Sequence, residues 1–456
     1  MHSDKVRKIY NNSRVIKNPF LLFLPFLLLY TGFVLLLHNN TMWGDEVRHY
    51  NSAVNLLNGV YSQPPPNVSF DTGPGYPLFM APFIALHLPL VWIKLMNAVF
   101  QYLSIICFFK SLQHFLLFKP ALIFSLFWGC YFHFFDFMAF IVAESLTIFL
   151  ASLLLLLLVK ALPENESKNT KRYVYLAGVT MGCMALTKVI FGYIIVFMMI
   201  GSVLFWVISR RSPNFKRVAF ITLIGLATTM PYLVYTYQLT GKFFYWSTSG
   251  GNNLYWMSNP FPGEYGDWLP APVSDSIETK STSKLETGGI LSIKNKTEYT
   301  PGMVDSIKSH HGKDFEYINR YNGVEKDDAY KSIAINNIKT HPGKYVMNWF
   351  SNLGRLLFNY PYSYTYQKPT TLVRIPLNGI IVVFIIFCLY PTIVNWRKIP
   401  FAIRLTLLFT LIYLGVSTLA SAETRMLTVV VPMLLLWIAF VITRSITIKL
   451  KDWESL

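Results

Sequence analysis

Long apolar runs, many of them close to twenty residues, constrain this chain more than any other feature of its sequence. A run of that length matches the roughly 20 residues that a helix needs to cross about 30 Å of hydrocarbon. The composition agrees, since 53% of the 456 residues are hydrophobic and only 14% are charged. The surface of a soluble domain of this size cannot accommodate that balance. The sequence therefore predicts an all-α polytopic membrane protein.

We expect about ten transmembrane helices, with both termini cytoplasmic. The net charge of +17 fits this layout, because Lys and Arg gather in the short gaps between the apolar runs, as the positive-inside rule requires. The charge therefore does not indicate nucleic-acid binding. The expected spans lie at roughly 20–37, 91–112, 120–136, 142–162, 173–187, 189–208, 218–235, 375–394, 403–420 and 426–443.

This layout divides the chain into three parts. Residues 1–235 are expected to form a transmembrane catalytic core of seven spans, which includes a first exoplasmic loop at 38–90. Residues 236–374 are expected to form a large second exoplasmic loop, which is too long for a simple connection and must carry structure or function. Residues 375–456 carry the last three spans. The expected location is the inner or plasma membrane of a bacterium.

The sequence of the first loop predicts helices that lie at the membrane surface. Apolar residues recur at helical spacing between Asp45 and Asn58, and Gly59 is a suitable C-terminal stop. A short amphipathic helix of this kind lies flat at the interface. The prolines within 77–89 then predict a second helix that is broken or interfacial rather than a clean span.

The second loop has three stretches of different character. Tyr and Trp within 244–268 are typical either of an interface belt or of a sugar-stacking wall, and both alternatives stay open. Residues 270–315 are polar and indicate no role. The stretch that follows predicts two helical pieces with a break at Pro342.

Ionisable residues from distant parts of the sequence meet, under this topology, at the exoplasmic boundary. Such groups are costly at membrane depth and usually face a cavity with partners. For Asp45 and Glu144 the alternative is an acid at a helix N-terminus, favoured by the helix dipole, and for Lys188 it is an ordinary loop lysine. The full set is Asp45, Glu46, Arg48, His49, Asp71, His133, Asp136, Glu144, Lys188, Glu423 and Arg425.

A series of short motifs resembles the GT-C superfamily of lipid-linked-sugar glycosyltransferases. The likeness is greatest to the branch of the protein O-mannosyltransferases and the lipid A aminoarabinose transferase. It spans most of residues 1–235 and the last spans, but not 270–315. The motifs are, in chain order, "GDEVRHY" after the first span, "GPGYPLF", "AESLTIFL", "ALTK", "INNIKTHPGKYV" and "ETRMLTVVVPMLLL".

The resemblance implies a GT-C fold and the transfer of a hexose or pentose from a polyprenyl-phosphate carrier on the exoplasmic face. The acceptor would be a lipid, a glycan or a protein, and membrane lipids would surround the enzyme. Asp45 matches the catalytic acid that the family carries after its first span, and Glu46 matches that residue's neighbour. The family often has a basic residue or a histidine before "PxYP", where this chain has "DTGPGYP", so one phosphate or substrate contact differs.

The residues suit this chemistry independently of the resemblance. A phosphate is already a good leaving group, so the reaction needs a base for the acceptor hydroxyl and cations for the developing phosphate charge. Asp45 is the candidate base, and a single base opposite the leaving group implies inversion at the anomeric carbon. The candidate donor-phosphate ligands are Lys188, Arg425 and Arg355. The candidate substrate-binding residues are Arg48, His49, Tyr50, Asp71, Tyr76, Asp136 and Glu144.

No cofactor follows from the sequence. The four cysteines fall inside apolar runs without metal-ligand spacing, so no metal site is predicted, and a requirement for a divalent cation is left open.

Two other functions stay as alternatives. A transporter or flippase of lipid-linked sugars would carry charges midway through its spans and symmetric broken helices. An O-antigen polymerase or ligase would rely on loop arginines, of which 236–354 has only Arg320.

Overall fold

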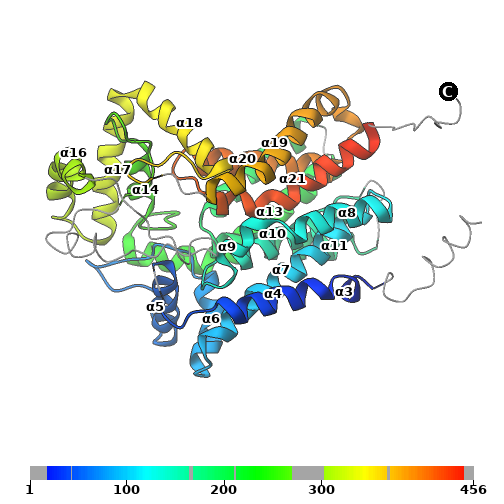
Figure 1. Cartoon of the computed structure of the whole chain (residues 1–456), viewed down its shortest axis with the longest axis horizontal. Coiled ribbons are helices and arrows are strands. Elements are labelled where there is room, and N and C mark those ends of the chain that lie inside the picture. Colours follow the sequence, from blue (N-terminus) through cyan, green and yellow to red (C-terminus); the bar gives the residue numbers. More distant parts are fainter. Residues whose placement is uncertain are drawn as a thin grey trace, which may run out of the picture.

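The computed structural model describes residues 18–42, 44–163, 168–209, 212–269, 302–366 and 370–445. Within these residues the chain consists of helices and connections, with no β-strand, which confirms the all-α prediction. Most helices run along the long axis of the molecule as a bundle, and α5, α14, α16 and α17 gather at one end of it (Figure 1). We call that end the cap end.

The bundle is built from the apolar helices that the sequence indicated. Its helices are α3 (Pro19–Leu22), α4 (Leu24–Leu37), α7 (Leu90–Gln113), α8 (Phe118–Gly129), η1 (Phe132–Phe134), α9 (Phe135–Met138), α10 (Glu144–Ala161), α11 (Thr170–Thr187), α12 (Ile190–Ile208), α13 (Pro213–Thr240), α19 (Thr370–Val394), η2 (Trp396–Lys398), α20 (Phe401–Thr418) and α21 (Thr424–Ser445). The other helices are α5 (Asp45–Leu57), α6 (Gly75–Ala85), α14 (Gly250–Met257), α16 (Met303–Ile318), α17 (Gly323–Thr340) and α18 (Pro342–Phe358).

Among the described residues, eight helical segments are long and apolar enough to cross a membrane, so the chain is an integral membrane protein. Two of the ten expected spans are not among them. The apolar helix α4 has 14 residues, and α11 begins with the polar run "TKRY". Both still pack inside the bundle, α4 against α7 and α11 against α10 and α13. The count of ten, and the domain boundaries after 235 and 374, stay predictions.

Small residues let α11 approach α13 closely. A Cβ atom added at Gly178 would lie 2.8 Å from the Ile221 carbonyl oxygen, and one added at Gly182 would lie 2.8 Å from that of Gly225. Neither position therefore has room for a side chain, and packing of this kind is typical of helices inside a membrane. It fixes the end of α11, where Lys188 follows.

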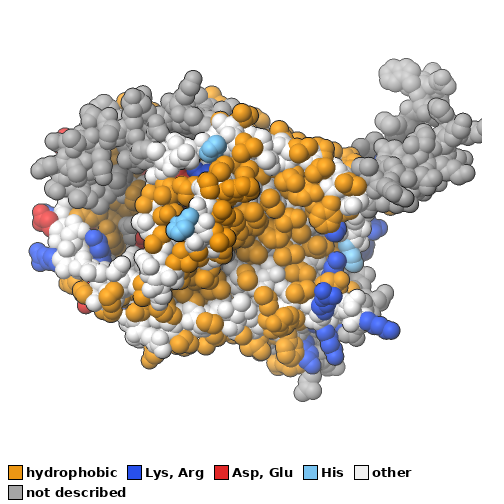
Figure 2. All heavy atoms as spheres, turned by 90° about the horizontal axis from the view of Figure 1, so that it is seen from below, with side chains coloured by type: hydrophobic (Ala, Val, Ile, Leu, Met, Phe, Trp, Pro, Cys, Tyr) orange, Lys and Arg blue, Asp and Glu red, His pale blue; other side chains and the backbone are white. Residues whose placement is uncertain are grey.

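The outside of the molecule has the pattern of a membrane protein. Hydrophobic side chains cover the middle of the bundle in Figure 2, and Lys and Arg gather at the right-hand end, away from the cap end. Because basic residues stay on the cytoplasmic side, this distribution agrees with the expected topology, in which the cap end is exoplasmic. The side of the membrane on which each end lies stays a prediction.

The interfacial helices of the first loop are confirmed as elements. Helix α5 begins at Asp45 and ends at Leu57, and Gly59 has a φ of +81°, which suits a glycine after a helix. Helix α6 is separate from α7, which begins at Leu90. Further along the chain, the predicted break at Pro342 is also confirmed, since α17 ends at Thr340 and α18 begins at the proline.

Four of the six Tyr and Trp residues within 244–268 are buried. Tyr255 and Trp256 are buried in the core of the cap end, and Trp246 is fully buried against Gly192 at the start of α12. These rings therefore form neither an interface belt nor a sugar-stacking wall. Trp268 is more than half exposed. Residues 270–301 of the polar stretch lie outside the described residues, and its last part begins α16.

The two long loops contact each other and so lie at the same end of the bundle. The Thr248 amide donates to the Phe70 carbonyl at 3.2 Å, and the Ser247 hydroxyl donates to the Asp71 carbonyl at 3.0 Å. Nearby, Gly323 at the start of α17 lies against the backbone of Val68. The second loop therefore holds the first loop in place at the cap end.

Candidate active site

Asp45, the first residue of α5, lies between two arginines. Arg48 Nη2 is 2.5 Å from one carboxylate oxygen, and Arg425 Nη1 is 2.9 Å from the other. Gly44 precedes it with a φ of +52°, a conformation that favours glycine and explains the "GD" pair in the motif. The Asp45 side chain keeps 33% of its surface exposed, so a substrate can reach it.

Arg425 joins Asp45 to two more carboxylates. Its Nη1 lies 3.5 Å from Glu144 Oε1, and its Nε lies 2.6 Å from Glu423 Oε2. Glu144 also accepts a hydrogen bond from Lys188 Nζ at 2.9 Å. We call these six side chains the Arg425 cluster: Asp45, Arg48, Glu144, Lys188, Glu423 and Arg425. The structure thus brings together five of the candidate catalytic and binding residues, with Glu423 as the sixth member.

Helix ends deliver these side chains to one place. Asp45 and Glu144 are the first residues of α5 and α10, Arg425 is in the first turn of α21, and Lys188 follows the last residue of α11. The glycines of "GPGYP" contribute here, because a Cβ atom at Gly75 would lie 2.7 Å from Thr187 Oγ1. The first loop can therefore pack directly on the end of α11, beside Lys188.

The charges of the cluster are balanced, with three carboxylates and three cations. Burial raises the pKa of the Asp45 carboxyl, but the Arg425 and Arg48 guanidinium groups lower it more, and the net pKa is well below its ordinary value. Asp45 is therefore ionised at neutral pH and is a weak base as long as both arginines contact it. Displacing one arginine would raise that pKa and make Asp45 a stronger base.

Glu46 has different surroundings from Asp45, although the two are adjacent. Its carboxylate is buried, accepts a hydrogen bond from the Ile141 amide at 2.8 Å, and lies 3.3 Å from Lys94 Nζ. Lys94 is 1% exposed and also donates to the Asn39 carbonyl at 2.7 Å. Glu46 therefore ties α5 to α7 and to the segment before α10, and its place suits positioning more directly than contact with a substrate.

The inner side of α5 packs on α6. His49 is buried, and its ring lies edge-on to Tyr76 with the centroids 5.0 Å apart. Tyr50 packs against the same hydrophobic group as Tyr76. Burial lowers the pKa of His49 to about 4, although the Asp45 and Glu144 carboxylates oppose this. His49 is therefore neutral at pH 7. These three candidate substrate-binding residues lie directly behind Asp45.

Asp71 lies at the outer edge of the cluster. Its carboxylate is 4.0 Å from Arg48 Nη1 and accepts a hydrogen bond from Thr248 Oγ1 at 3.2 Å. Its side chain is 38% exposed. Asp71 thus connects the Arg425 cluster to the second loop and stays accessible.

Asp136 and Arg355 have partners outside the cluster. Asp136 lies 2.6 Å from Arg374 Nη2 and 3.7 Å from His133 Nδ1. The Arg355 guanidinium is 1% exposed and donates to the Tyr265 and Pro361 carbonyls, each at 2.9 Å. The structure therefore places Arg355 as a support for the cap end, and its role as a phosphate ligand stays an untested prediction.

Sequence reasoning missed two charged residues that the structure shows to be partners of candidates. Lys94 pairs with Glu46, and Arg374 pairs with Asp136. Each is a lone cation near the start of an apolar run, in "LVWIKLMNAV" and "TLVRIPLNGI". Because a charge at membrane depth needs a partner, these isolated cations were the signal that could have found them.

No three His, Cys, Asp or Glu side chains within the described ranges are grouped closely enough to hold a metal ion. The three carboxylates of the cluster surround Arg425, which occupies the centre where a cation would otherwise lie. The carboxylates of the cluster therefore have cationic side chains as their partners in this structure.

The chain is similar to solved structures of membrane transferases. The match to ArnT from Cupriavidus metallidurans bound to undecaprenyl phosphate has 14% sequence identity and a TM-score of 0.39, and covers 93% of this chain and 77% of that one. The match to the Archaeoglobus fulgidus oligosaccharyltransferase tethered with an acceptor peptide has 12% identity and a TM-score of 0.49, and covers 93% and 49%.

A second structure of that oligosaccharyltransferase, AglB in complex with an inhibitory peptide and a dolichol-phosphate, matches with 12% identity and a TM-score of 0.48, over 95% of this chain and 51% of that one. The chain thus spans about half the length of the oligosaccharyltransferase chains. A scan against family models and a search of curated proteins find no match. ArnT and AglB are enzymes of the GT-C superfamily, which the motifs of this chain resemble.

Proposed function

We propose that this protein is an inverting membrane glycosyltransferase of the GT-C type. It moves a hexose or pentose from a polyprenyl-phosphate donor to an acceptor hydroxyl, at the exoplasmic face of a bacterial inner or plasma membrane. The observation that carries the proposal is the Arg425 cluster itself. A partly exposed carboxylate lies between two arginines, at the helix ends where a lipid phosphate would arrive.

The donor phosphate binds to Arg425, with Lys188 beside it. Arginine suits a bidentate contact with phosphate oxygens. Both cations already contact Glu144, so the carboxylates keep them oriented before the donor arrives. When the phosphate takes up the Arg425 donors, it competes with Asp45 for them.

Asp45 then acts as the base. As Arg425 turns to the phosphate, the pKa of Asp45 rises toward its ordinary value, and the carboxylate accepts the proton of the acceptor hydroxyl. The acceptor oxygen attacks the anomeric carbon from the side opposite the phosphate. The bond between that carbon and the phosphate oxygen breaks, and its electron pair leaves with the polyprenyl phosphate. One displacement of this kind inverts the anomeric configuration.

The remaining candidates act around this centre. Glu46 positions α5 through Lys94, and Glu144 anchors Lys188 and Arg425. Arg48 and Asp71 are the accessible groups beside Asp45, and they are suited to hydroxyl groups of the sugar. His49, Tyr50 and Tyr76 form the wall behind, and Asp136 pairs with Arg374 outside the cluster.

The proposal is tested with the purified protein and synthetic polyprenyl-phosphate sugars. We expect release of polyprenyl phosphate, detected by mass spectrometry, in the presence of an acceptor, and a product whose anomeric configuration is inverted by NMR. A transporter or flippase would consume none of these donors. Turnover of a diphosphate-linked oligosaccharide alone would identify a polymerase or ligase, and a retained configuration would exclude the single displacement.

A further inference from the structure

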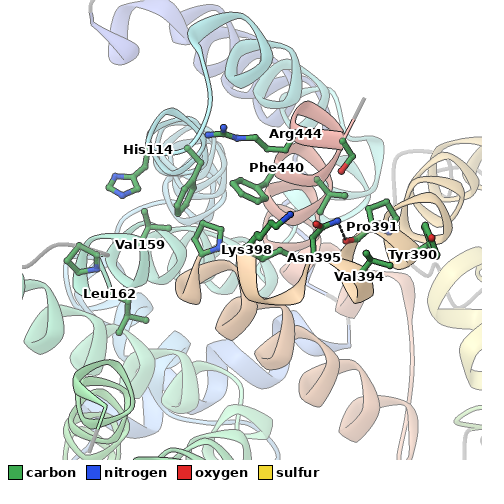
Figure 3. A pocket seen from close by; sticks show the side chains of 16 residues that line it. His114, Val159, Leu162, Tyr390, Pro391, Val394, Asn395, Lys398, Phe440 and Arg444 are labelled. Atoms are coloured by element: carbon green, nitrogen blue, oxygen red, sulfur yellow. Dashed lines mark hydrogen bonds between the residues drawn. The ribbon is translucent and has the colours of Figure 1, made fainter. Parts of the chain in front are cut away.

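A cavity of about 970 Å³ lies at the opposite end of the bundle from the Arg425 cluster. It is formed where α7, α10, α19 and α21 end, together with η2 (Figure 3). Glu144 and Arg425 are at the first turns of α10 and α21, whereas the cavity is lined by residues of their last turns or just beyond, among them Val159 and Arg444. The proposed transfer reaction therefore has no use for this cavity.

The polar part of the cavity is cationic. Lys398 from η2 and Arg444 from the last turn of α21 line it, and none of the sixteen lining residues that the structure describes carries a carboxylate. The Arg444 guanidinium lies 5.9 Å from the centroid of the Phe440 ring. Figure 3 shows Lys398, Asn395 and Arg444 around this ring. The Asn395 amide donates to the Pro391 carbonyl at 3.2 Å.

The apolar part of the cavity continues onto the outer surface of the bundle. Tyr390 and Val394 of α19 line the cavity and are also 76% and 62% exposed. Phe387 and Ile393 extend the same exposed apolar surface along α19. In an integral membrane protein, such a surface faces lipid. A ligand that fills the cavity would therefore have an anionic head and a hydrocarbon tail.

We propose that this cavity binds the headgroup of an anionic phospholipid, with its phosphate between Lys398 and Arg444 and its acyl chains along α19. The cavity lies at the end where basic side chains gather (Figure 2), which the positive-inside rule places on the cytoplasmic side. That leaflet contains anionic lipids, and basic pockets between helices bind their headgroups. The lipid would hold together the ends of α10, α19 and α21.

The test uses the full-length protein in detergent and adds phosphatidylglycerol, phosphatidylcholine or inorganic phosphate. Native mass spectrometry counts the retained lipid, and thermal melting measures stabilisation. We compare the wild type with Lys398→Gln, with the double variant Lys398→Gln/Arg444→Gln, and with Arg397→Gln. Arg397 is a matched control because it is the exposed cation next to Lys398 and does not line the cavity.

We expect phosphatidylglycerol to be retained by the wild type and by Arg397→Gln, and to raise their melting temperatures. Since each basic residue contributes about 1 kcal/mol to such binding, affinity should fall about 5-fold in Lys398→Gln and about 30-fold in the double variant. Equal retention by all variants would overturn the proposal, and so would equal binding of phosphatidylcholine. Stabilisation by inorganic phosphate alone would make the cavity a free-anion site. The single variant decides the matter if the double variant does not fold.

Discussion

Asp45 and Glu46 are adjacent carboxylates on α5, yet they belong to two different regions of the molecule. Asp45 is one-third exposed and shares Arg425 with two other carboxylates in the Arg425 cluster. Glu46 is buried, forms an ion pair with Lys94 and accepts a hydrogen bond from the Ile141 amide. The first region is accessible and has several competing partners, whereas the second is inaccessible and has fixed ones.

Under the proposed function, this difference separates chemistry from positioning. A cation shared by several carboxylates can exchange one for an incoming phosphate at little cost, because each carboxylate that it leaves retains solvent or another cation. A buried pair cannot exchange partners, since separating it leaves an uncompensated charge in the interior. The comparison therefore predicts that changes in the Arg425 cluster alter catalysis, whereas changes at Glu46 and Lys94 alter stability.

The largest effect is expected for Asp45→Asn. Asparagine keeps the shape of the side chain and is acceptable at a helix start, but it cannot accept the acceptor's proton. We expect sugar transfer to fall by about 10²- to 10⁴-fold, with donor binding at least as strong as in the wild type, because the phosphate no longer competes with a carboxylate for Arg425. Turnover with a synthetic donor measures the loss. The control is Asp328→Asn, an exposed carboxylate that pairs with Lys242 at the cap end.

If the Asp45→Asn protein transferred sugar at the parent rate, Asp45 would be only a helix-start acid. A large loss of donor binding with unchanged turnover of bound donor would instead make Asp45 an anchor for Arg425. Either result would erase the contrast between the two regions.

Glu46→Gln is expected to act on stability. Glutamine can still accept the Ile141 hydrogen bond, but it leaves the buried Lys94 ammonium without its counter-charge, which costs about 3–5 kcal/mol. The melting temperature should fall markedly, while the folded protein keeps more transfer activity than Asp45→Asn. The double variant Glu46→Gln/Lys94→Met should be more stable than Glu46→Gln, because both charges are removed. A single variant that melts like the wild type would contradict the assignment.

The sequence was sufficient to predict the start and end of α5, because apolar spacing and the flanking glycines act locally. It also placed Asp45, Glu144, Lys188 and Arg425 on one face, and the structure brings these four side chains together; their roles stay predictions. The partners were harder to predict. Neighbouring residues on a helix point about 100° apart, so Asp45 and Glu46 face different surroundings, which depend on contacts with distant segments.

Two further expectations show the same limit. Tyr and Trp are typical of a membrane interface belt, but they also form protein cores. For Tyr255 and Trp256, the packing of α14 on α17 decides between these alternatives. Arg355 is a cation near the boundary, but its guanidinium donates to two carbonyl groups of the cap end and to the Asn352 side chain. Sequence position shows where a charge lies along the chain, and it does not show which groups neutralise it.

A smaller effect is expected when the cations of the Arg425 cluster are removed singly. A charge-assisted hydrogen bond contributes about 1.5–3 kcal/mol, so Arg425→Ala should weaken donor binding by about 10- to 150-fold. Lys188→Ala should have a smaller effect, because Glu144 keeps Arg425 as a partner. Donor affinity is measured by titration with a fluorescent polyprenyl-phosphate sugar. The control is Lys242→Ala, and unchanged affinity in both variants would remove the phosphate site from this cluster.

At neutral pH the smallest effect is expected for His49, which lies between the two regions on the inner side of α5. Its pKa is lowered to about 4 from an ordinary value of 6.5, so the unfolded chain binds its proton more readily than the folded protein does. The stability that His49 contributes is therefore complete above about pH 6.5. It is lost as the pH falls toward 4, at a rate of about 1.4 kcal/mol per pH unit.

Thermal melts at pH 7, 6, 5 and 4 test this expectation by comparing the wild type with His49→Gln, which cannot take up a proton. Acidification should lower the melting temperature of the wild type more than that of the variant, and the difference should develop between pH 6.5 and 4. In an Asp45→Asn background the wild-type histidine should become still more acid-sensitive, because the Asp45 carboxylate helps to stabilise its charged form. Parallel curves for the wild type and His49→Gln would mean that His49 stays accessible to water and belongs to the open region with Asp45.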